Sequence, residues 1–399
     1  MKFELIKIHS ETSLENIEKQ KQNFANIISL WNRDYINEAE FKKEHNERED
    51  TYTYEGFSNE EILYYYLNRQ THFDQEKRIK DESRTLYARD LSQFYFFIKQ
   101  STEFLQQDVK DYKVGQVWRN LRKRHIRNYQ KWLSQDAISY QSKEKYKAST
   151  ISRKLGVIRS YLKWLYEIQY IQEPLHVEIL STAVNKQHKP KRELSYEEVK
   201  QLLNYYKDNE INYALLSVLA TTGLRVAEVA HAKWEDLEYD AIRGRYYLIV
   251  DTKGDNERIV SINKEIFNRI IAFRIRRRLP VDIGNKNGKT IFQTKNHTAY
   301  RENYLSQYIS KIIKDTKLSF TENIRITPHF FRHFYVQYLY DYKRLAPHVI
   351  AAAVGHKNDR TTKENYLKQR LTKDNDAGNL LRKMNSNFVH IKINCVIYI

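Results

Sequence analysis

Two arginines, two histidines and a tyrosine in the second half of this chain have the chemistry needed to break a phosphodiester bond. They follow one another as Arg225, His329, Arg332, His356 and Tyr366. A phosphate under attack spreads negative charge over its non-bridging oxygens, and a planar guanidinium can bind two of these oxygens at once. Histidine adds donors that also move protons near neutral pH, and a tyrosine hydroxyl can be the nucleophile of a covalent intermediate. Because the two arginines are far apart in the chain, the fold must bring them together.

Each of these residues also has an ordinary structural explanation. Arg225 and Glu228 are three residues apart after a Thr-Gly turn, which is typical of a helix start with a surface ion pair. The Thr-Pro pair before His329 is typical of a first helical turn, where a partly buried histidine is common. Tyr366 is one of 31 tyrosines. The catalytic interpretation depends on the joint occurrence of these residues, in one order, within three short motifs.

The three motifs are TTGLRVAE at 221–228, TPHFFRH at 327–333 and VGHKNDRTTKENY at 354–366. Together they resemble the motif boxes of the tyrosine recombinases, the phage integrase and Xer family, and the resemblance extends over roughly residues 80–385. The roles that it implies are first-box arginine for Arg225, second-box pair for His329 and Arg332, third-box histidine for His356 and nucleophile for Tyr366. One departure is that the interval from the third-box histidine to the tyrosine is one residue longer than in the commonest Xer pattern.

The family also has a catalytic lysine on the turn of a β-hairpin between its first two boxes. Residues 245–251 and 258–262 alternate apolar and polar side chains around a Lys-Gly-Asp-Asn turn, which predicts a hairpin independently of the resemblance. Lys253 therefore matches the lysine that protonates the leaving 5′ oxygen, and a solvated turn lysine is its structural alternative. We expect Glu228 and His333 to orient their neighbours rather than to react.

Composition agrees with a nucleic-acid enzyme. The 399 residues include 68 Lys and Arg against 50 Asp and Glu, a formal charge of +18 that would attract polyanions in a salt-dependent way. A Lys-rich soluble protein is the alternative explanation. Charges interrupt the apolar residues at the start, and no apolar run reaches the roughly twenty residues that span a bilayer. A single cysteine, Cys395, excludes an internal disulfide and a cysteine metal cage, so we expect a cytoplasmic, nucleoid-associated protein without metal or cofactor.

A polar, proline-broken segment at residues 186–192 separates two parts of the chain. Ser195 and Glu198 follow it with the spacing of a capping box, which predicts a helix start. Amphipathic periodicity predicts further helices near 59–68, 115–133 and 149–168. The divisions that we expect are an N-terminal extension of unassigned role at 1–78, a helical core-binding (SAM-like) domain at 79–185, a catalytic domain at 186–385 and a strand-like tail at 386–399. This tail could pair with the hairpin in the same chain, dock on a neighbouring protomer, or be a frayed end.

Basic residues gather in two stretches of the expected core-binding domain, at 119–125 and 143–153. A basic helical face is often only solvated, but beside a recombinase catalytic domain we expect phosphate contacts. The candidates for DNA binding are Arg119, Arg122, Lys123, Arg124, Lys145, Lys147, Arg153 and Lys154.

The sequence predicts a mainly α fold with one small β-sheet (α+β), and the resemblance implies that its two domains form a C-shaped clamp around DNA. The function implied is site-specific recombination through a 3′-phosphotyrosyl intermediate, with integration or excision of a mobile element as its outcome. The expected partners are a specific double-stranded DNA site, three further copies of the chain in a tetramer on DNA, and accessory DNA-bending proteins; the free protein would be a monomer or weak dimer. The alternatives are Xer-type dimer resolution, a type IB topoisomerase or telomere resolvase, and a DNA-binding relic that no longer cleaves.

Overall fold

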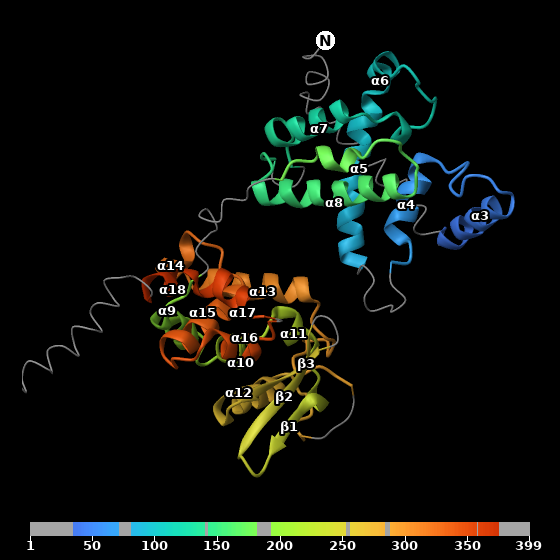
Figure 1. Ribbon diagram of the computed structural model, residues 1–399. Helices are drawn as coiled ribbons and strands as arrows, with labels where there is room; N and C mark the ends of the chain where they lie inside the picture. The colour runs from blue at the N-terminus through green and yellow to red at the C-terminus, as the bar shows by residue number, and fades with distance from the viewer. Residues whose placement is uncertain are drawn as a thin grey trace, which may run out of the picture. The chain divides into compact units, whose positions relative to one another are not determined.

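The computed structural model describes residues 35–71, 81–139, 143–181, 193–252, 256–283, 288–356 and 358–374. The chain forms two compact units, Met1–Lys189 and Pro190–Ile399, each with its own hydrophobic core. The first unit is helical in its described part, and the second combines helices with a three-stranded sheet. The expected mainly α fold with one small sheet is therefore confirmed (Figure 1).

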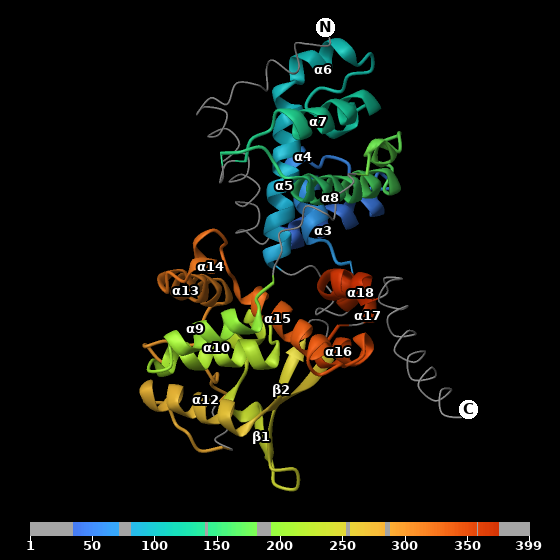
Figure 2. The ribbon, with the colours of Figure 1, turned by 90° about the vertical axis from the view of Figure 1, so that its left-hand side faces the viewer.

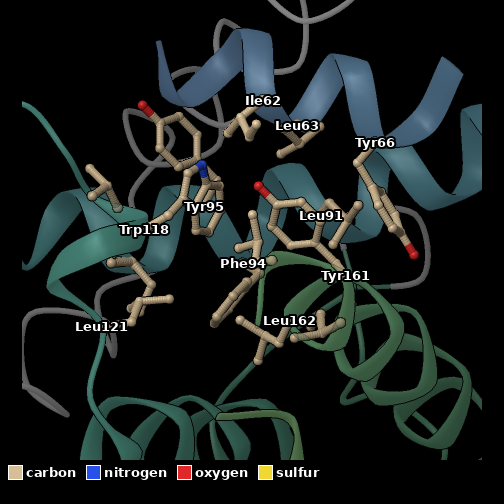
Figure 3. Close-up of a cluster of buried hydrophobic side chains, with 14 of the residues drawn as sticks. Ile62, Leu63, Tyr66, Leu91, Phe94, Tyr95, Trp118, Leu121, Tyr161 and Leu162 are labelled. Atoms are coloured by element: carbon tan, nitrogen blue, oxygen red, sulfur yellow. The ribbon is translucent and has the colours of Figure 1, made fainter. Parts of the chain in front are cut away.

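The helices of the first unit surround a dense aromatic core. They are α3 (Ile36–Arg48), α4 (Asn59–Asn68), α5 (Asp81–Gln100), α6 (Thr102–Asp108), α7 (Lys123–Gln135) and α8 (Ala148–Glu167), with 3-10 turns at Trp118–Asn120 and Leu175–Glu178. In both ribbon views α7 and α8 lie across the long helix α5 (Figures 1 and 2). Leu63 from α4, Phe94 from α5 and Tyr161 from α8 converge in this core (Figure 3).

Helix α4 is buried in the core of the first unit. A capping box between Ser58 and Glu61 starts it, and six consecutive residues from Ile62 to Leu67 are then buried. A helix that is apolar on all sides must be covered on all sides. The carbonyl of Asn59, its first residue, accepts a hydrogen bond from the Trp118 indole at 2.9 Å. The described part of the expected extension at 1–78 thus packs into the same core as α5, α7 and α8.

The helix expected near 115–133 begins later, at Lys123. Gly115 has a φ of +74°, and the segment that follows it forms turns and a 3-10 helix instead of an α-helix. The Trp118 side chain is fully buried there, so packing of this aromatic residue overrides the helical periodicity. Helices expected near 59–68 and 149–168 are confirmed as α4 and α8.

The second unit opens with the predicted capping box. The Ser195 hydroxyl accepts from the amide of Glu198, whose carboxylate accepts from the amide of Ser195. Its described elements are α9 (Tyr196–Tyr205), α10 (Glu210–Thr222), α11 (Val226–His231), a 3-10 turn (Trp234–Asp236), β1 (Leu237–Asp240), β2 (Arg245–Thr252), β3 (Asn256–Ile262), α12 (Lys264–Arg276), α13 (Glu302–Asp315), α14 (Ser319–Glu322), α15 (Pro328–Asp341), α16 (Pro347–Ala353), α17 (Asp359–Thr362), a π-helical turn (Lys363–Leu367) and α18 (Lys368–Asp374).

The sheet is antiparallel in the order β1-β2-β3, and β2 and β3 form the predicted hairpin. Its buried face carries Leu248, Val250 and Val260, which share a core with α10 and α12. Helix α12 lies beside β2 (Figure 1). The hairpin turn that carries Lys253 and the strand-like tail at 386–399 lie outside the described residues.

The turn after α10 fits closely against α15. Gly223 ends α10 in the left-handed conformation, with a φ of +61°, which glycine adopts without strain. A β-carbon built on Gly223 would lie 2.3 Å from Cδ1 of Tyr335. Space and backbone geometry therefore both require glycine at this position.

We predict that Gly223→Ala destabilises the protein by about 3 kcal/mol, because it adds a steric clash to an unfavourable φ. Gly244→Ala is a matched control, since Gly244 has a φ of +60° but no heavy atom within 4 Å of an added β-carbon. It should lose only the backbone contribution, about 1 kcal/mol. Equal losses for the two variants in chemical denaturation of the full chain would contradict this packing.

Candidate active site

Arg225 is fixed at the start of α11 by Glu228. The backbone amide of Arg225 donates to one carboxylate oxygen of Glu228 at 2.8 Å, and its Nη1 donates to the other at 2.7 Å. The Glu228 side chain is only 5% exposed, whereas that of Arg225 is 40% exposed. A buried carboxylate thus orients a guanidinium that still presents donors to solvent. The expected orienting role of Glu228 has a geometric basis in these contacts.

Arg332 connects the three motifs from a fully buried position on α15. Its Nη1 donates to the carbonyl of Gly223 at 2.6 Å, and its Nη2 donates to the carbonyl of Val354. Gly223 precedes Arg225 by two residues, and Val354 precedes His356 by two. Burial, followed by the charge of Arg225, lowers the pKa of Arg332, but a guanidinium stays charged at neutral pH. Arg332 therefore holds the first and third motifs against the second.

His356 is held between Arg332 and Thr362. Nη2 of Arg332 lies 3.2 Å from Nε2 of His356, and Nδ1 of His356 lies 2.7 Å from the hydroxyl of Thr362. A guanidinium can only donate, so Nε2 accepts and Nδ1 carries the proton. Burial, together with the charges of Arg332 and Arg225, lowers the pKa of His356 from 6.5 to about 4. This histidine is therefore neutral near pH 7.

Tyr366 lies among the histidines of the second and third motifs. The centroid of its ring is 4.2 Å from that of His333, 5.2 Å from His356 and 5.9 Å from His329. The residue is 8% exposed, so its ring is enclosed beside these three histidines. All five catalytic candidates within the described residues therefore meet in one place.

A π-helical turn at Lys363–Leu367 carries Tyr366. It joins α17 to α18, and Tyr366 is its fourth residue. A π turn adds one residue to a helix, and such turns are frequent at functional sites. From this turn the tyrosine ring packs against that of His333.

The site carries an excess of positive charge. Three arginines, Arg225, Arg258 and Arg332, lie around the single carboxylate of Glu228, which leaves a net charge of +2 among these four groups. His356 adds none, because its pKa is about 4. Such an excess favours an anion with more than one charged oxygen, as a phosphate has during nucleophilic attack.

Sequence reasoning missed two residues that hold the site together. Arg258 on β3 forms a buried ion pair with Glu228 at 2.8 Å, and the fully buried Thr362 bonds His356. Arg258 precedes Val260 and Ile262 at steps of two residues, so it lies on the buried face of its strand. An arginine at such a position is a signal that could have found it.

Most of the basic candidates of the first unit are engaged by acidic side chains. Lys154 is buried and donates to Asp90 at 2.8 Å and to Gln93 at 2.9 Å. Arg153 pairs with the same aspartate. The pairs in the other stretch are Arg119 with Glu55, Arg122 with Glu173, Lys123 with Glu178 and Arg124 with Asp108. Lys154 therefore stabilises the core, because its amine cannot reach a phosphate without leaving Asp90.

Lys145 and Lys147 differ from the other candidates. Both are exposed directly before the start of α8, and neither has a carboxylate within ion-pair distance among the described residues. Donors at a helix start favour phosphate oxygens. These two lysines are thus the DNA-binding candidates without an acidic partner in the described part of the chain.

Two other kinds of site are not found in the described ranges. Their His, Cys, Asp and Glu side chains include no group of three or more that could hold a metal ion. None of their helices is both long and apolar enough to cross a membrane.

From the low pKa of His356 we predict how the stability of the protein depends on pH. Because the folded-state pKa of about 4 lies below the ordinary 6.5, the stability contributed by neutral His356 is complete above 6.5 and is lost as the pH falls toward 4. His356→Gln should lack this dependence. The free energy of unfolding of the wild type should therefore decline more steeply than that of the variant between pH 7 and pH 5 in urea titrations.

The exposed His348 on the neighbouring helix α16 provides the control. His348→Gln should follow the wild-type pH dependence. The wild type and His356→Gln could instead differ by the same free energy of unfolding at pH 7 and at pH 5. That result would show that His356 does not titrate as its surroundings imply.

Comparison with known proteins agrees with this geometry. The model of the phage integrase family matches residues 192–372. The tyrosine recombinase XerC of Natranaerobius thermophilus is 25% identical over 293 residues, which cover 72% of this chain and 88% of the relative. A TnP I resolvase of Bacillus thuringiensis is 26% identical over 290 residues, which cover 66% of this chain and 92% of the relative.

Solved structures share the fold. The XerH recombinase in a post-cleavage complex with palindromic difH DNA superposes with a TM-score of 0.53 at 17% identity, covering 73% of this chain and 79% of that one. The Tn1549 transposon integrase, bound to circular intermediate DNA, gives a TM-score of 0.52 at 15% identity, covering 81% of this chain and 97% of that one. With its motifs gathered into one site, the chain belongs to the tyrosine recombinase family, whose members cleave and rejoin DNA through a phosphotyrosine intermediate.

Proposed function

We propose that Tyr366 is the nucleophile of this recombinase. Its hydroxyl oxygen attacks the scissile phosphorus and releases its proton to solvent, the bond from phosphorus to the 5′ oxygen breaks, and a 3′-phosphotyrosyl link and a free 5′-hydroxyl result. The 5′ oxygen takes its proton from Lys253, the residue that matches the family lysine. Because the link conserves the energy of the phosphodiester, rejoining needs no nucleotide cofactor. The observation that carries this proposal is the packing of the Tyr366 ring beside His329, His333 and His356, the last of which is bonded by Arg332.

The arginines and histidines stabilise the pentavalent transition state in this proposal. Arg225 and Arg332 bind the non-bridging oxygens, and His329 donates a further hydrogen bond. Both Nη atoms of Arg332 already donate to carbonyls that belong to the site. The geometry of the phosphate pocket is therefore set before DNA binds, which is what transition-state stabilisation requires.

His356 acts as a hydrogen-bond donor once DNA is bound. Without DNA its Nε2 accepts from Arg332, and to donate to a phosphate oxygen it must carry its proton on Nε2 instead. The Thr362 hydroxyl suits both tautomers, since a hydroxyl can accept from Nδ1–H or donate to a bare Nδ1. Thr362 therefore orients the imidazole in either state.

The nucleophile can be tested with a nicked suicide substrate drawn from DNA flanking the gene of this protein. We predict a denaturation-resistant protein–DNA adduct with the wild type and none with Tyr366→Phe, because the variant lacks the attacking oxygen. Tyr340→Phe is the matched control, since Tyr340 also lies in the second unit but its hydroxyl bonds Asp374. An adduct that persists in Tyr366→Phe would mean that another residue is the nucleophile.

DNA binding by the first unit is proposed to involve Lys145 and Lys147, which have no carboxylate partner among the described residues. Each phosphate contact adds about 0.9 to the slope of log K against log salt concentration. Lys145→Ala/Lys147→Ala should therefore reduce that slope by about 2 in titrations of duplex DNA. Arg124→Ala should change it less, because Arg124 already pairs with Asp108 at 2.5 Å. A wild-type slope in the double variant would show that these lysines do not contact DNA phosphates.

The biological outcome that we propose is integration and excision of a mobile element. The XerC relative aligns over 88% of its own length but only 72% of this chain, so this protein carries more sequence than a minimal Xer recombinase. Xer-type dimer resolution is the second candidate, supported by the several XerC relatives. Suicide substrates from the ends of a surrounding element and from the chromosome terminus would separate the two, since the adduct should form on the true site.

The acting assembly is proposed to be a tetramer on two DNA sites, with each chain closing its two units around the duplex as a C-shaped clamp. The free protein would be a monomer or weak dimer in the cytoplasm, and accessory DNA-bending proteins would join it at the nucleoid. The family membership supports this proposal, and analytical ultracentrifugation with and without the cleaved site would test it.

A further inference from the structure

Arg258 is a buried arginine that the proposed chemistry does not use. It lies on β3 and is 9% exposed, and its position is paired with Val250 of β2. A buried charge is costly unless its hydrogen bonds are satisfied. Nη2 of Arg258 donates to Glu228 at 2.8 Å, and Nη1 donates to the carbonyl of Ala353 at 2.5 Å. One guanidinium thus contacts the last residue of the first motif and the residue directly before the third motif.

The contact with Glu228 extends to Arg225. The same oxygen of Glu228 accepts from Arg258 and from the backbone amide of Arg225, and the other oxygen accepts from the Arg225 guanidinium. Burial alone would raise the pKa of Glu228, but Arg258 and then Arg225 outweigh it and lower the pKa. Glu228 is therefore a carboxylate shared by two arginines, one buried and one facing solvent. Without Arg258 it would be free to turn fully toward Arg225.

The contact with Ala353 extends to His356. Ala353 ends α16, and its carbonyl is adjacent to that of Val354, which accepts from Arg332. Two arginines thus hold two consecutive carbonyls in the segment that leads to His356. The amide of His356 donates to the carbonyl of Ala351 at 2.9 Å, so this turn is fixed to the end of α16.

We propose that Arg258 is a positioning residue for DNA cleavage, holding Arg225 through Glu228 and His356 through Ala353 on the strand that follows the Lys253 turn. It does not touch the phosphate. This inference rests on the proposed roles of Arg225, His356 and Tyr366. It links the hairpin to the first and third motifs, which no catalytic candidate does among the described residues.

A merely structural ion pair is the competing explanation, and stability alone would not separate the two. Removing one partner of a buried ion pair destabilises a protein whichever role the pair has. A positioning role predicts that cleavage suffers even where folding and DNA binding do not, because small misplacements of catalytic groups cost about 100-fold in rate. The informative quantity is therefore the rate of adduct formation at saturating DNA, beside the dissociation constant and the unfolding midpoint.

The test compares Arg258→Met and Arg258→Lys with the wild type on the suicide substrate. We expect Arg258→Met to lower the rate at saturating DNA by about 100-fold, with a dissociation constant within about twofold of the wild type. Arg258→Lys keeps the charge and one hydrogen bond, so it should recover part of the rate. Arg245→Met is the control, since Arg245 is exposed on the adjacent strand β2 and should leave the rate unchanged.

The outcomes separate this inference from the proposed function. A wild-type rate in Arg258→Met overturns the positioning role and leaves Tyr366 as the nucleophile. Parallel losses of rate, affinity and unfolding midpoint in Arg258→Met, without recovery in Arg258→Lys, would show a structural role only. An adduct that survives in Tyr366→Phe overturns the proposed function, and the positioning role falls with it.

Discussion

The hydrogen bonds of the buried Arg332 guanidinium are the interaction on which the catalytic unit depends. They join the turn after α10 to the turn after α16, with α15 between them. Both acceptors are backbone carbonyls, so the bonds do not depend on a side chain at either position. The three motifs are far apart in sequence, and the buried side chain of Arg332 fixes their positions relative to one another. A buried charge satisfied in this way is rigid, because leaving either carbonyl would expose an unpaired donor.

The charge balance of the site includes repulsion between two arginines. The guanidinium of Arg332 is close enough to Arg225 for their repulsion to lower its pKa, and burial adds to this effect. A bound phosphate would relieve that repulsion. Binding energy and catalytic geometry therefore come from the same groups, as is common where stability is given up for function.

Local sequence patterns predicted the elements that carry the site but not the contacts between them. The capping box at Ser195 and the β2–β3 hairpin depend on residues within a few positions of each other, and both are confirmed. Arg258 bonds to Ala353, a residue 95 positions away, so no local pattern contains that contact. Lys154 is buried against Asp90, 64 residues earlier, for the same reason. The positive charge of a helix did not show which of its amines were already paired with carboxylates of the fold.

The burial of α4 in the core has a consequence for how this protein can be shortened. A fragment that began at residue 79 would keep α5, α7 and α8 but remove a helix that packs against α5 and α8. The Trp118 indole would lose its acceptor on Asn59, and the aromatic core would open to water. Substitutions in residues 59–68 should therefore impair folding and lower the abundance of the protein in the cell. They should leave the choice of DNA site unchanged.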